Sequence, residues 1–253
     1  MSTYMSIAQK AAYAAGKFLK KREDLKVDND SSHDIKLASD KKSEQIIIDV
    51  LHQTGIDILS EERGLIKGLN SSDLKWVVDP LDGSINFLKG LPELSCISIA
   101  LFNQGMPLLG VIYRYAGDEM FAGGVGKQAT LNGEAIRASG VKKVRDAVLA
   151  TGFASSRDYS DKSLLSYVSY AKNFKKVRML GSSAVMGCCV ACGRVDAYIE
   201  DDIRLWDVAS LMPIIDGAGG VFTINHKNDY TCDFRAFASQ ELKDDFLCIK
   251  QNG

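Results

Sequence analysis

The 253-residue sequence lacks an apolar run of about 18 residues, the length that a membrane-spanning helix requires. Its first ten residues have no long apolar core with a small-residue cleavage pattern, so no secretory signal is expected. A net charge of −1, from 31 basic and 32 acidic residues, gives no overall field that attracts nucleic acid or an anionic membrane. These absences predict a soluble cytoplasmic protein with no nucleic-acid or membrane partner, whose ligands are bound by local charge.

The sequence also lacks a low-complexity linker and a disulfide framework. Its six cysteines do not show framework spacing, so reduced thiols are expected. Cys189 and Cys192 match a Cys-x-x-Cys pattern, but they lie in a continuous stretch of small apolar residues. No second thiol pair or histidine accompanies them, so buried structural cysteine is favoured over a redox or zinc role.

The hydrophobic periodicity changes near the middle of the chain. Strands with turn signals between them predict a largely antiparallel meander, and Asn132-Gly133 predicts a hairpin. Alternating helices and strands follow, which favours layered α/β structure. Helices are expected at 4–22, 39–54, 161–172, 183–192, 208–217 and from 241, and strands at 56–60, 94–102, 107–113, 119–122, 148–151, 175–180, 195–199, 220–224 and 236–239. The prediction is an α/β (α+β layered) fold in two halves, residues 1–140 and 141–253.

The most informative segment is residues 76–87, where an apolar strand leads to Asp79 and Asp82. Pro80 and Gly83 are expected to stop the strand and turn the chain, so both carboxylates would converge on one small volume. Two like charges held that close cost several kcal/mol unless a cation neutralises them. Oxygen ligands of this kind suit Mg²⁺ or Mn²⁺.

Two other segments place acids at the end of a predicted element. Residues 56–60 form a short strand that ends in Glu61-Glu62, and an acidic stretch from Glu200 to Asp207 precedes an apolar helix. Any one of these acids alone would be taken for a solvated loop carboxylate. The set of three acidic segments is far more specific than a single Asp-x-x-Asp.

Together, Glu-Glu, Asp-Pro-x-Asp-Gly-Ser-x-Asn-Phe and Trp-Asp before a small-residue helix resemble the inositol monophosphatase family of Mg²⁺-dependent, lithium-sensitive phosphatases. Their order fits, as does the gap of about 125 residues between the last two, and the resemblance covers nearly the whole chain. It implies the sugar-phosphatase fold, alternating α and β layers with the metal site between the halves. It also implies a homodimer and two or three Mg²⁺ ions per site, with Mn²⁺ as a substitute.

The resemblance implies a ligand set for these metals. Asp79 would bridge two metals, Glu61 and the main-chain oxygen of Leu81 would complete the first, and Asp82 and Asp207 would complete the second. Two such metals can activate water and clamp the phosphate oxygens, so no protein nucleophile is required.

The expected catalytic residues are Ser84, Asp40 and Glu61. Ser84 stands where the family usually has Thr and keeps a hydroxyl that can orient the attacking water. Asp40 would accept a hydrogen bond from Ser84, although the segment around it matches the family only loosely. The alternative for Asp40 is a place in the first turn of a helix, where a negative charge is favoured, and the two roles are compatible.

The residues expected to contact substrate are Asp82, Gly83, Ser84, Gly181, Ser182, Ser183 and Glu200. Ser182 could instead only cap the following helix. Glu200 matches the family's acceptor for a sugar or cyclitol hydroxyl, and its alternative is a solvated acid at a strand end. Asp201 and Asp202 match no family role. For Arg204, solvation or pairing with Asp201 is favoured over contact with a second substrate phosphate.

The leading function is hydrolysis of a small polyol phosphate, with inositol monophosphate as the family's usual substrate. Fructose 1,6-bisphosphatase is the nearest alternative, because the metal motifs do not separate the two. A 3′(2′),5′-bisphosphate nucleotidase ranks third, since Ile85-Asn86-Phe87 fits the sugar or inositol branch. A catalytically weak member that acts as a binding protein is the alternative from another class, and the intact acid set argues against it.

Overall fold

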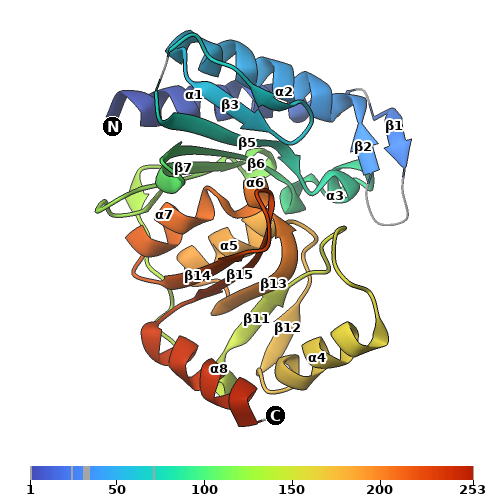
Figure 1. Cartoon of the computed structure of the whole chain (residues 1–253), viewed down its shortest axis with the longest axis vertical. Helices are drawn as coiled ribbons and strands as arrows, with labels where there is room; N and C mark the ends of the chain where they lie inside the picture. Colours follow the sequence, from blue (N-terminus) through green and yellow to red (C-terminus); the bar gives the residue numbers. More distant parts are fainter. Residues whose placement is uncertain (1, 24, 31–34, 71, 253) are drawn as a thin grey trace.

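The computed structural model describes the chain except residues 1, 24, 31–34, 71 and 253. Its helices and two large sheets alternate in layers, as Figure 1 shows from top to bottom. Two long N-terminal helices cover the outer face of the first sheet, a second group of helices lies between the two sheets, and two more helices cover the far face of the second sheet. The predicted α/β layered fold is therefore confirmed.

The first sheet has eight strands in the order β10-β9-β8-β7-β6-β5-β3-β4. Their bounds are β3 Asp57–Ser60, β4 Gly64–Ile66, β5 Leu74–Asp82, β6 Cys96–Asn103, β7 Met106–Arg114, β8 Glu119–Gly124, β9 Thr130–Leu131 and β10 Glu134–Ala135. Every neighbouring pair is antiparallel except β3 and β5. Asn132 and Gly133 both have positive φ, 52° and 87°, so the hairpin predicted from this pair is confirmed.

The second sheet has five strands in the order β12-β11-β13-β15-β14. Their bounds are β11 Val148–Thr151, β12 Lys176–Arg178, β13 Ala197–Arg204, β14 Val221–His226 and β15 Thr231–Phe237. β11 is parallel to β12 and β13, and the other pairs are antiparallel. A separate two-stranded sheet joins β1 Val27–Asp30 to β2 Ile35–Leu37.

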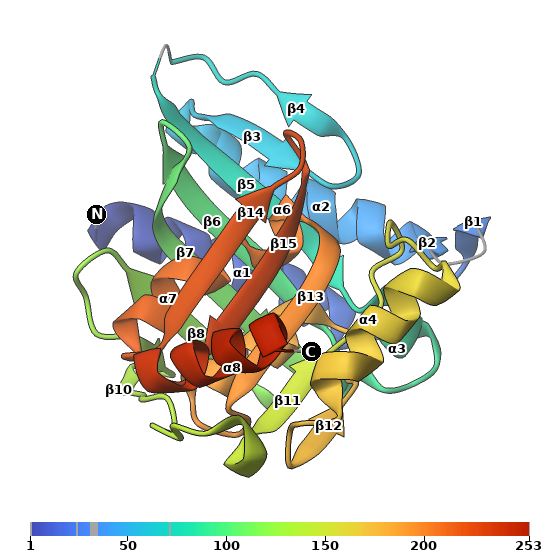
Figure 2. The same ribbon diagram turned by 60° about the horizontal axis from the view of Figure 1, so that its bottom comes forward.

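The helices fill the spaces around these sheets. Their bounds are α1 Ser2–Leu19, α2 Ala38–Leu51, α3 Ser84–Leu88, α4 Asp161–Ala171, α5 Ser183–Ala191, α6 Leu205–Val208, α7 Leu211–Gly217 and α8 Gln240–Asn252. Figure 2 shows α8 crossing in front of the second sheet, with α4 beside β11 and β12. In the part of the chain that the structure describes, no helix has the length and apolar character needed to cross a membrane.

The largest buried cluster lies between the two sheets and joins both halves of the chain. It packs Leu59 and Val77 of the first sheet with Val185 of α5 and Phe234 of the second. All nine residues of α5 are buried, as expected for a helix that is apolar all round. All six cysteines are free thiols, which confirms the prediction of reduced cysteine. The division at residue 140 stays a prediction.

Several element boundaries differ from the predictions, and three of them concern β5, the helices α6 and α7, and β13. β5 does not stop at Pro80 but continues to Asp82. The helix predicted at 208–217 is two helices, α6 and α7, because Pro213 has no N–H to donate to the carbonyl of Ala209 in a continuous helix. β13 runs beyond the predicted end at residue 199, so Glu200 lies inside the strand.

Candidate active site

All the predicted site residues line one pocket of about 540 Å³. The predicted residues on its wall are Asp40, Glu61, Asp79, Leu81, Asp82, Gly83, Ser84, Gly181, Ser182, Ser183, Glu200 and Asp207. They come from β5 and its neighbours in the first half, and from α5, α6 and β13 in the second. The structure therefore brings together residues that are up to 167 positions apart in the sequence.

A bulge in β5 turns both of its aspartates toward this pocket. Asp79 is opposite Ser98 of β6, whereas Asp82 is opposite Cys96, so three steps along β5 match two along β6. In a regular strand, residues three apart point to opposite faces, and one extra residue corrects this. The Leu81 N–H donates to Asp79 Oδ1 at 3.0 Å, and the Ser43 hydroxyl donates to the Pro80 carbonyl at 2.7 Å, which holds the bulge in place.

The buried carboxylates repel one another. Burial raises the pKa of Asp79 well above its usual range, and the charges of Glu61, Asp82 and Asp207 raise it further. Burial also raises the pKa of Asp207 well above its usual range, again with contributions from Asp82 and Glu61. A cation among these acids would remove the repulsion, and an all-oxygen donor set suits Mg²⁺.

Within the described residues, no three acidic, cysteine or histidine side chains are close enough to form a complete metal cluster. The carboxylates are instead distributed around the pocket. Their number and their oxygen donors fit Mg²⁺, and the geometry in which they would bind it stays a prediction. Glu61 lies in the turn after β3, where its N–H donates to the Val78 carbonyl at 3.2 Å. The buried Glu44 of α2 accepts from the Arg63 N–H at 3.1 Å and pairs with its guanidinium at 2.9 Å, which anchors this turn.

Asp40 and Ser84 lie within hydrogen-bonding distance. The Ser84 hydroxyl is 3.4 Å from Asp40 Oδ1 and 2.9 Å from the Leu81 carbonyl, so it can donate to either oxygen. Asp40 also accepts the Leu37 N–H at 2.7 Å in the first turn of α2, so both of its predicted contacts are present. Burial raises the pKa of Asp40 to about 7.

The segment that precedes α5 lies directly against the bulge of β5. Asp82 Oδ2 accepts the Ser182 hydroxyl and the Ala184 N–H, each at 2.7 Å. Ser182 also caps α5 by accepting the Val185 N–H at 3.3 Å, so its capping role and its place in the pocket coexist. Asn86 donates to the Leu94 carbonyl at 2.8 Å and to the Leu180 carbonyl at 2.7 Å, so it ties the turn after β5 to the segment before α5.

Glu200 lies across the pocket, on β13. It is buried, so the alternative of a solvated strand-end acid is wrong. Its Oε2 accepts the Tyr198 hydroxyl at 2.8 Å, and burial raises its pKa to about 7. A buried carboxylate with an oriented partner can bind hydroxyl groups of a ligand.

The pairing predicted between Arg204 and Asp201 is wrong. Asp201 contacts Arg235 at 3.0 Å and Arg157 at 3.8 Å, while Arg204 lines the pocket and donates to Thr231 Oγ1 at 3.1 Å. The cause is the pairing of β13 with β15. Arg235 is opposite Ile199, and Asp201 follows two residues later on the same strand, so its carboxylate reaches Arg235.

Sequence reasoning missed two parts of the pocket wall. The first is residues 152–155, which follow β11. Their place after the carboxyl end of a parallel strand was an available signal, because ligands of α/β sheets gather at such ends. The second is Lys36, which pairs with Glu62 at 2.7 Å, and nothing in its local sequence singles it out.

Comparisons of the sequence and of the structure with known proteins agree on one family. The model described as the inositol monophosphatase family matches residues 1–248. The chain is 34% identical over 241 residues to Nus factor SuhB of Pasteurella multocida, which covers 92% of this chain and 86% of that protein. It is 35% identical over 226 residues to the inositol-1-monophosphatase of Mesorhizobium japonicum, with 87% and 84% covered. The solved inositol monophosphatase of an Anabaena (Nostoc) species superposes with a TM-score of 0.86 and 30% identity, over 99% of this chain and 96% of that one. The chain therefore belongs to the inositol monophosphatase family of phosphoric monoester hydrolases.

Proposed function

We propose that this chain hydrolyses the phosphate monoester of a small polyol in a Mg²⁺-dependent reaction, with an inositol monophosphate as substrate. The observation that carries the proposal is the distribution of acids around one pocket. Glu61, Asp79, Asp82 and Asp207 line it together with Glu200 of β13. A phosphate bound through cations would then share the pocket with an acceptor for hydroxyl groups.

The residues proposed to hold Mg²⁺, or Mn²⁺ in its place, are Glu61, Asp79, Asp82, Asp207 and the carbonyl of Leu81. Two or three ions per site would fit the family. When bound, Mg²⁺ supplies Lewis-acid stabilisation of the phosphoryl oxygens and activation of water. The mutual repulsion of the buried carboxylates supports this assignment, because each raises the pKa of its neighbours.

Ser84 and Asp40 are proposed to orient the attacking water. When the Ser84 hydroxyl donates its hydrogen bond to Asp40, a lone pair of its Oγ can accept a hydrogen bond from a water molecule. As the water attacks, it would give one proton to Ser84 Oγ while Ser84 passes its own proton to Asp40, which suits a carboxyl whose pKa burial raises to about 7. Gly83 and Ser84 lie beside Asp82, where the phosphate would bind.

Glu200 is proposed to bind the hydroxyl groups of the substrate's alcohol portion. The Tyr198 hydroxyl fixes one carboxylate oxygen, and the remaining acceptor capacity is available to the polyol. Gly181, Ser182 and Ser183 form the neighbouring wall. Lithium sensitivity and a homodimer follow from the family resemblance, and a cytoplasmic location is the expectation from the sequence. All three belong to the same proposal.

Fructose 1,6-bisphosphate is the second candidate substrate. The observation that favours it is the presence of two cationic side chains, Lys36 and Arg204, among the acids of the pocket. A second phosphate on the substrate would pair with either of them. A 3′(2′),5′-bisphosphate nucleotide is the third candidate substrate. A binding role without turnover is the alternative from another class, since several relatives carry the name Nus factor.

A phosphatase panel tests these proposals. The purified chain is assayed with Mg²⁺, and with EDTA, on myo-inositol 1-phosphate, fructose 1,6-bisphosphate, 3′-phosphoadenosine 5′-phosphate and p-nitrophenyl phosphate. We expect Mg²⁺-dependent turnover with the highest kcat/KM on the inositol phosphate. Preference for fructose 1,6-bisphosphate would select the second candidate. Absence of Mg²⁺-dependent turnover on all four substrates would leave the binding role.

A further inference from the structure

The segment between β11 and α4 forms one wall of the pocket. Gly152, Phe153, Ala154 and Ser155 line the pocket, although this segment belongs to no helix or strand. Gly152 lies directly against the carboxylate of Glu200, because a Cβ atom at this position would be 2.8 Å from Glu200 Oε1. Any movement of the segment therefore changes the space around Glu200.

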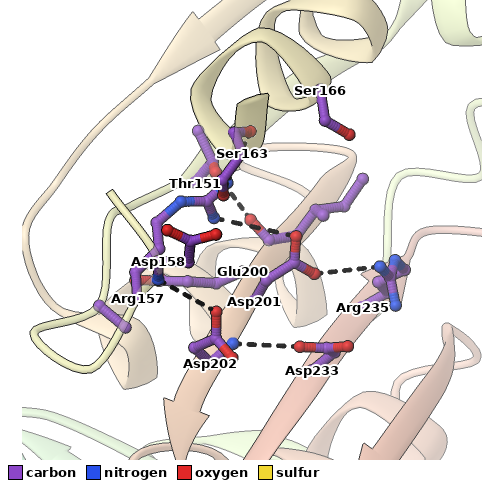
Figure 3. Close-up of polar contacts among 12 residues, drawn as sticks. Thr151, Arg157, Asp158, Ser163, Ser166, Glu200, Asp201, Asp202, Asp233 and Arg235 are labelled. Atoms are coloured by element: carbon purple, nitrogen blue, oxygen red, sulfur yellow. Dashed lines mark hydrogen bonds and ion pairs between the residues drawn. The ribbon is translucent and has the colours of Figure 1, made fainter. Parts of the chain in front are cut away.

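A buried arginine lies behind this wall. The side chain of Arg157 is only 3% exposed and does not line the pocket. Its guanidinium is 3.8 Å from Asp201 and donates to the main-chain and side-chain oxygens of Ser163 at 3.4 and 3.3 Å, as Figure 3 shows. It also lies 5.2 Å from the ring centre of Phe153, within range of a cation–π contact. Arg157 thus ties the wall segment to α4 and β13.

The bulge of β13 supplies the other half of this attachment. The strand register shifts between Glu200 and Ile203, and Asp202 has a φ of 60°. The Ser156 hydroxyl donates to the Asp202 carbonyl, and the Asp158 N–H is 3.5 Å from the Asp202 carboxylate. The three residues that follow the wall segment, 156–158, therefore contact the two residues that follow Glu200 in the sequence.

A buried guanidinium needs a charge partner and several acceptors. Here the ion pair with Asp201 is 3.8 Å long, and Nε has no hydrogen-bond partner within the described residues. Because burial of this guanidinium costs free energy that its contacts only partly offset, Arg157 contributes little to the stability of the fold. What it does provide is a fixed distance between the wall segment and the strand of Glu200.

We propose that Arg157, held by Asp201, is a positioning residue that fixes the wall segment 152–155 against Glu200 and so determines which alcohol the pocket accepts. This rests on the proposed function, because it assigns Glu200 to the alcohol side. The phosphate side depends on Asp79, Asp82 and their neighbours. Within the described part of the chain, Arg157 has its hydrogen bonds and ion pair with Ser163 and Asp201 instead. Loss of Arg157 should therefore affect recognition of the polyol more than hydrolysis of the phosphate.

Arg235 offers a matched control. It binds the same carboxylate, Asp201, at 3.0 Å, but it lies on β15 and is 18% exposed. Removing Arg235 disturbs Asp201 and the bulge without a direct effect on the wall segment. A change in substrate preference that substitution of Arg157 causes, and substitution of Arg235 does not, would be due to the wall segment.

The test measures kcat and KM for myo-inositol 1-phosphate and for p-nitrophenyl phosphate in Arg157→Met, Arg157→Lys and Arg235→Met. We expect Arg157→Met to raise KM for the inositol phosphate about tenfold, because misplacement of a binding group by about 1 Å can cost at least that factor. kcat and KM for the aryl phosphate should change less than about twofold. Arg157→Lys should recover part of the loss, and Arg235→Met should leave the ratio of the two kcat/KM values unchanged.

Three results would overturn the proposal: equal losses on both substrates, no change on either, or the same shift in Arg235→Met. If Arg157→Met does not fold, Asp201→Asn replaces it, and the same comparison of substrates decides. Failure of the proposed function itself has a different signature, because the wild-type chain would then show no Mg²⁺-dependent hydrolysis of p-nitrophenyl phosphate.

Discussion

The carboxylate of Asp82 accepts a hydrogen bond of 2.7 Å from the hydroxyl of Ser182, 100 residues later in the chain. The Ala184 N–H donates to the same oxygen, so the start of α5 stabilises the charged form of Asp82 and opposes the effect of burial on its pKa. Within the described residues, α5 makes no such contact with Asp79 or Asp207. The pocket is thus assembled from segments far apart in the sequence, and Asp82 is the central acid that the start of α5 stabilises.

The first prediction concerns Asp79→Asn. Asparagine keeps the oxygen that accepts the Leu81 N–H, so the bulge should persist, but a neutral amide binds Mg²⁺ poorly. We expect loss of Mg²⁺-dependent turnover on every substrate. In EDTA the variant should melt no lower than the wild type, because one of several repelling charges is gone. Near-normal activity would contradict the metal assignment.

The second prediction is a pH dependence of stability without metal. Burial raises the pKa of Asp40 and of Glu200 to about 7 in the folded protein. The folded state therefore binds protons more tightly than the unfolded chain, so stability should fall as pH rises from about 4 toward 7 and level off above. Deprotonation of each group lowers the free energy of unfolding by on the order of 3–4 kcal/mol, because the pKa rises from 3.8 for Asp40, or from 4.5 for Glu200, to about 7.

Melting temperatures in EDTA between pH 5 and pH 8 check this prediction. The wild type should melt lower at pH 8 than at pH 5.5, Glu200→Gln should show a smaller difference, and added Mg²⁺ should raise the value most at pH 8. A melting temperature in EDTA that increases between pH 5.5 and pH 8 would contradict this prediction. It would show that deprotonation of Asp40 and Glu200 does not destabilise the folded protein.

Much of the fold was predictable because it is local. The strand 148–151 and the Asn132-Gly133 hairpin match the structure, since periodicity and turn chemistry act over a few residues. The bulges in β5 and β13 were not predictable, because they depend on the partner strand. The bulge in β5 turns Asp82 to the same side as Asp79, and the contact of Asp201 with Arg235 depends on how β13 pairs with β15, so the pairing considered for Arg204 failed there.

Glu61, Asp79, Asp82 and Asp207 could be picked out as acids at the ends of elements, and the other candidates through the family resemblance. The structure brings all of them to one pocket, and their roles stay predictions. The wall segment 152–155 and its attachment through Arg157 were not. They rest on contacts between residues about 45 positions apart, such as Arg157 with Asp201, for which no local pattern exists.

The third prediction compares two glycines with positive φ. Gly83 has a φ of 87°, and a Cβ atom there would be 2.8 Å from the Leu94 carbonyl, whereas Gly64 has a φ of 67° and nothing within 4 Å. Gly64→Ala should cost about 1 kcal/mol from backbone strain alone. Gly83→Ala adds the clash and should cost about 3 kcal/mol in unfolding free energy.

Urea unfolding measures both free energies, and p-nitrophenyl phosphate turnover measures the effect on the site. Gly83→Ala should also lose most activity, because Asp82 and Ser84 flank it, while Gly64→Ala should keep it. Equal costs for the two variants would show that the turn after β5 can relax around a side chain.

The last prediction concerns Glu200→Gln. The amide keeps the shape of the side chain and can still accept the Tyr198 hydroxyl, but it loses the charge that strengthens hydrogen bonds to the polyol. Loss of a charge-assisted hydrogen bond is worth about 1.5–3 kcal/mol, so kcat/KM for myo-inositol 1-phosphate should fall on the order of ten- to a hundred-fold. p-Nitrophenyl phosphate offers no hydroxyl to Glu200 and should be hydrolysed nearly as before. Steady-state kinetics on both substrates measure the difference, and a proportional loss on both would remove Glu200 from the alcohol side and weaken the assignment of a polyol substrate.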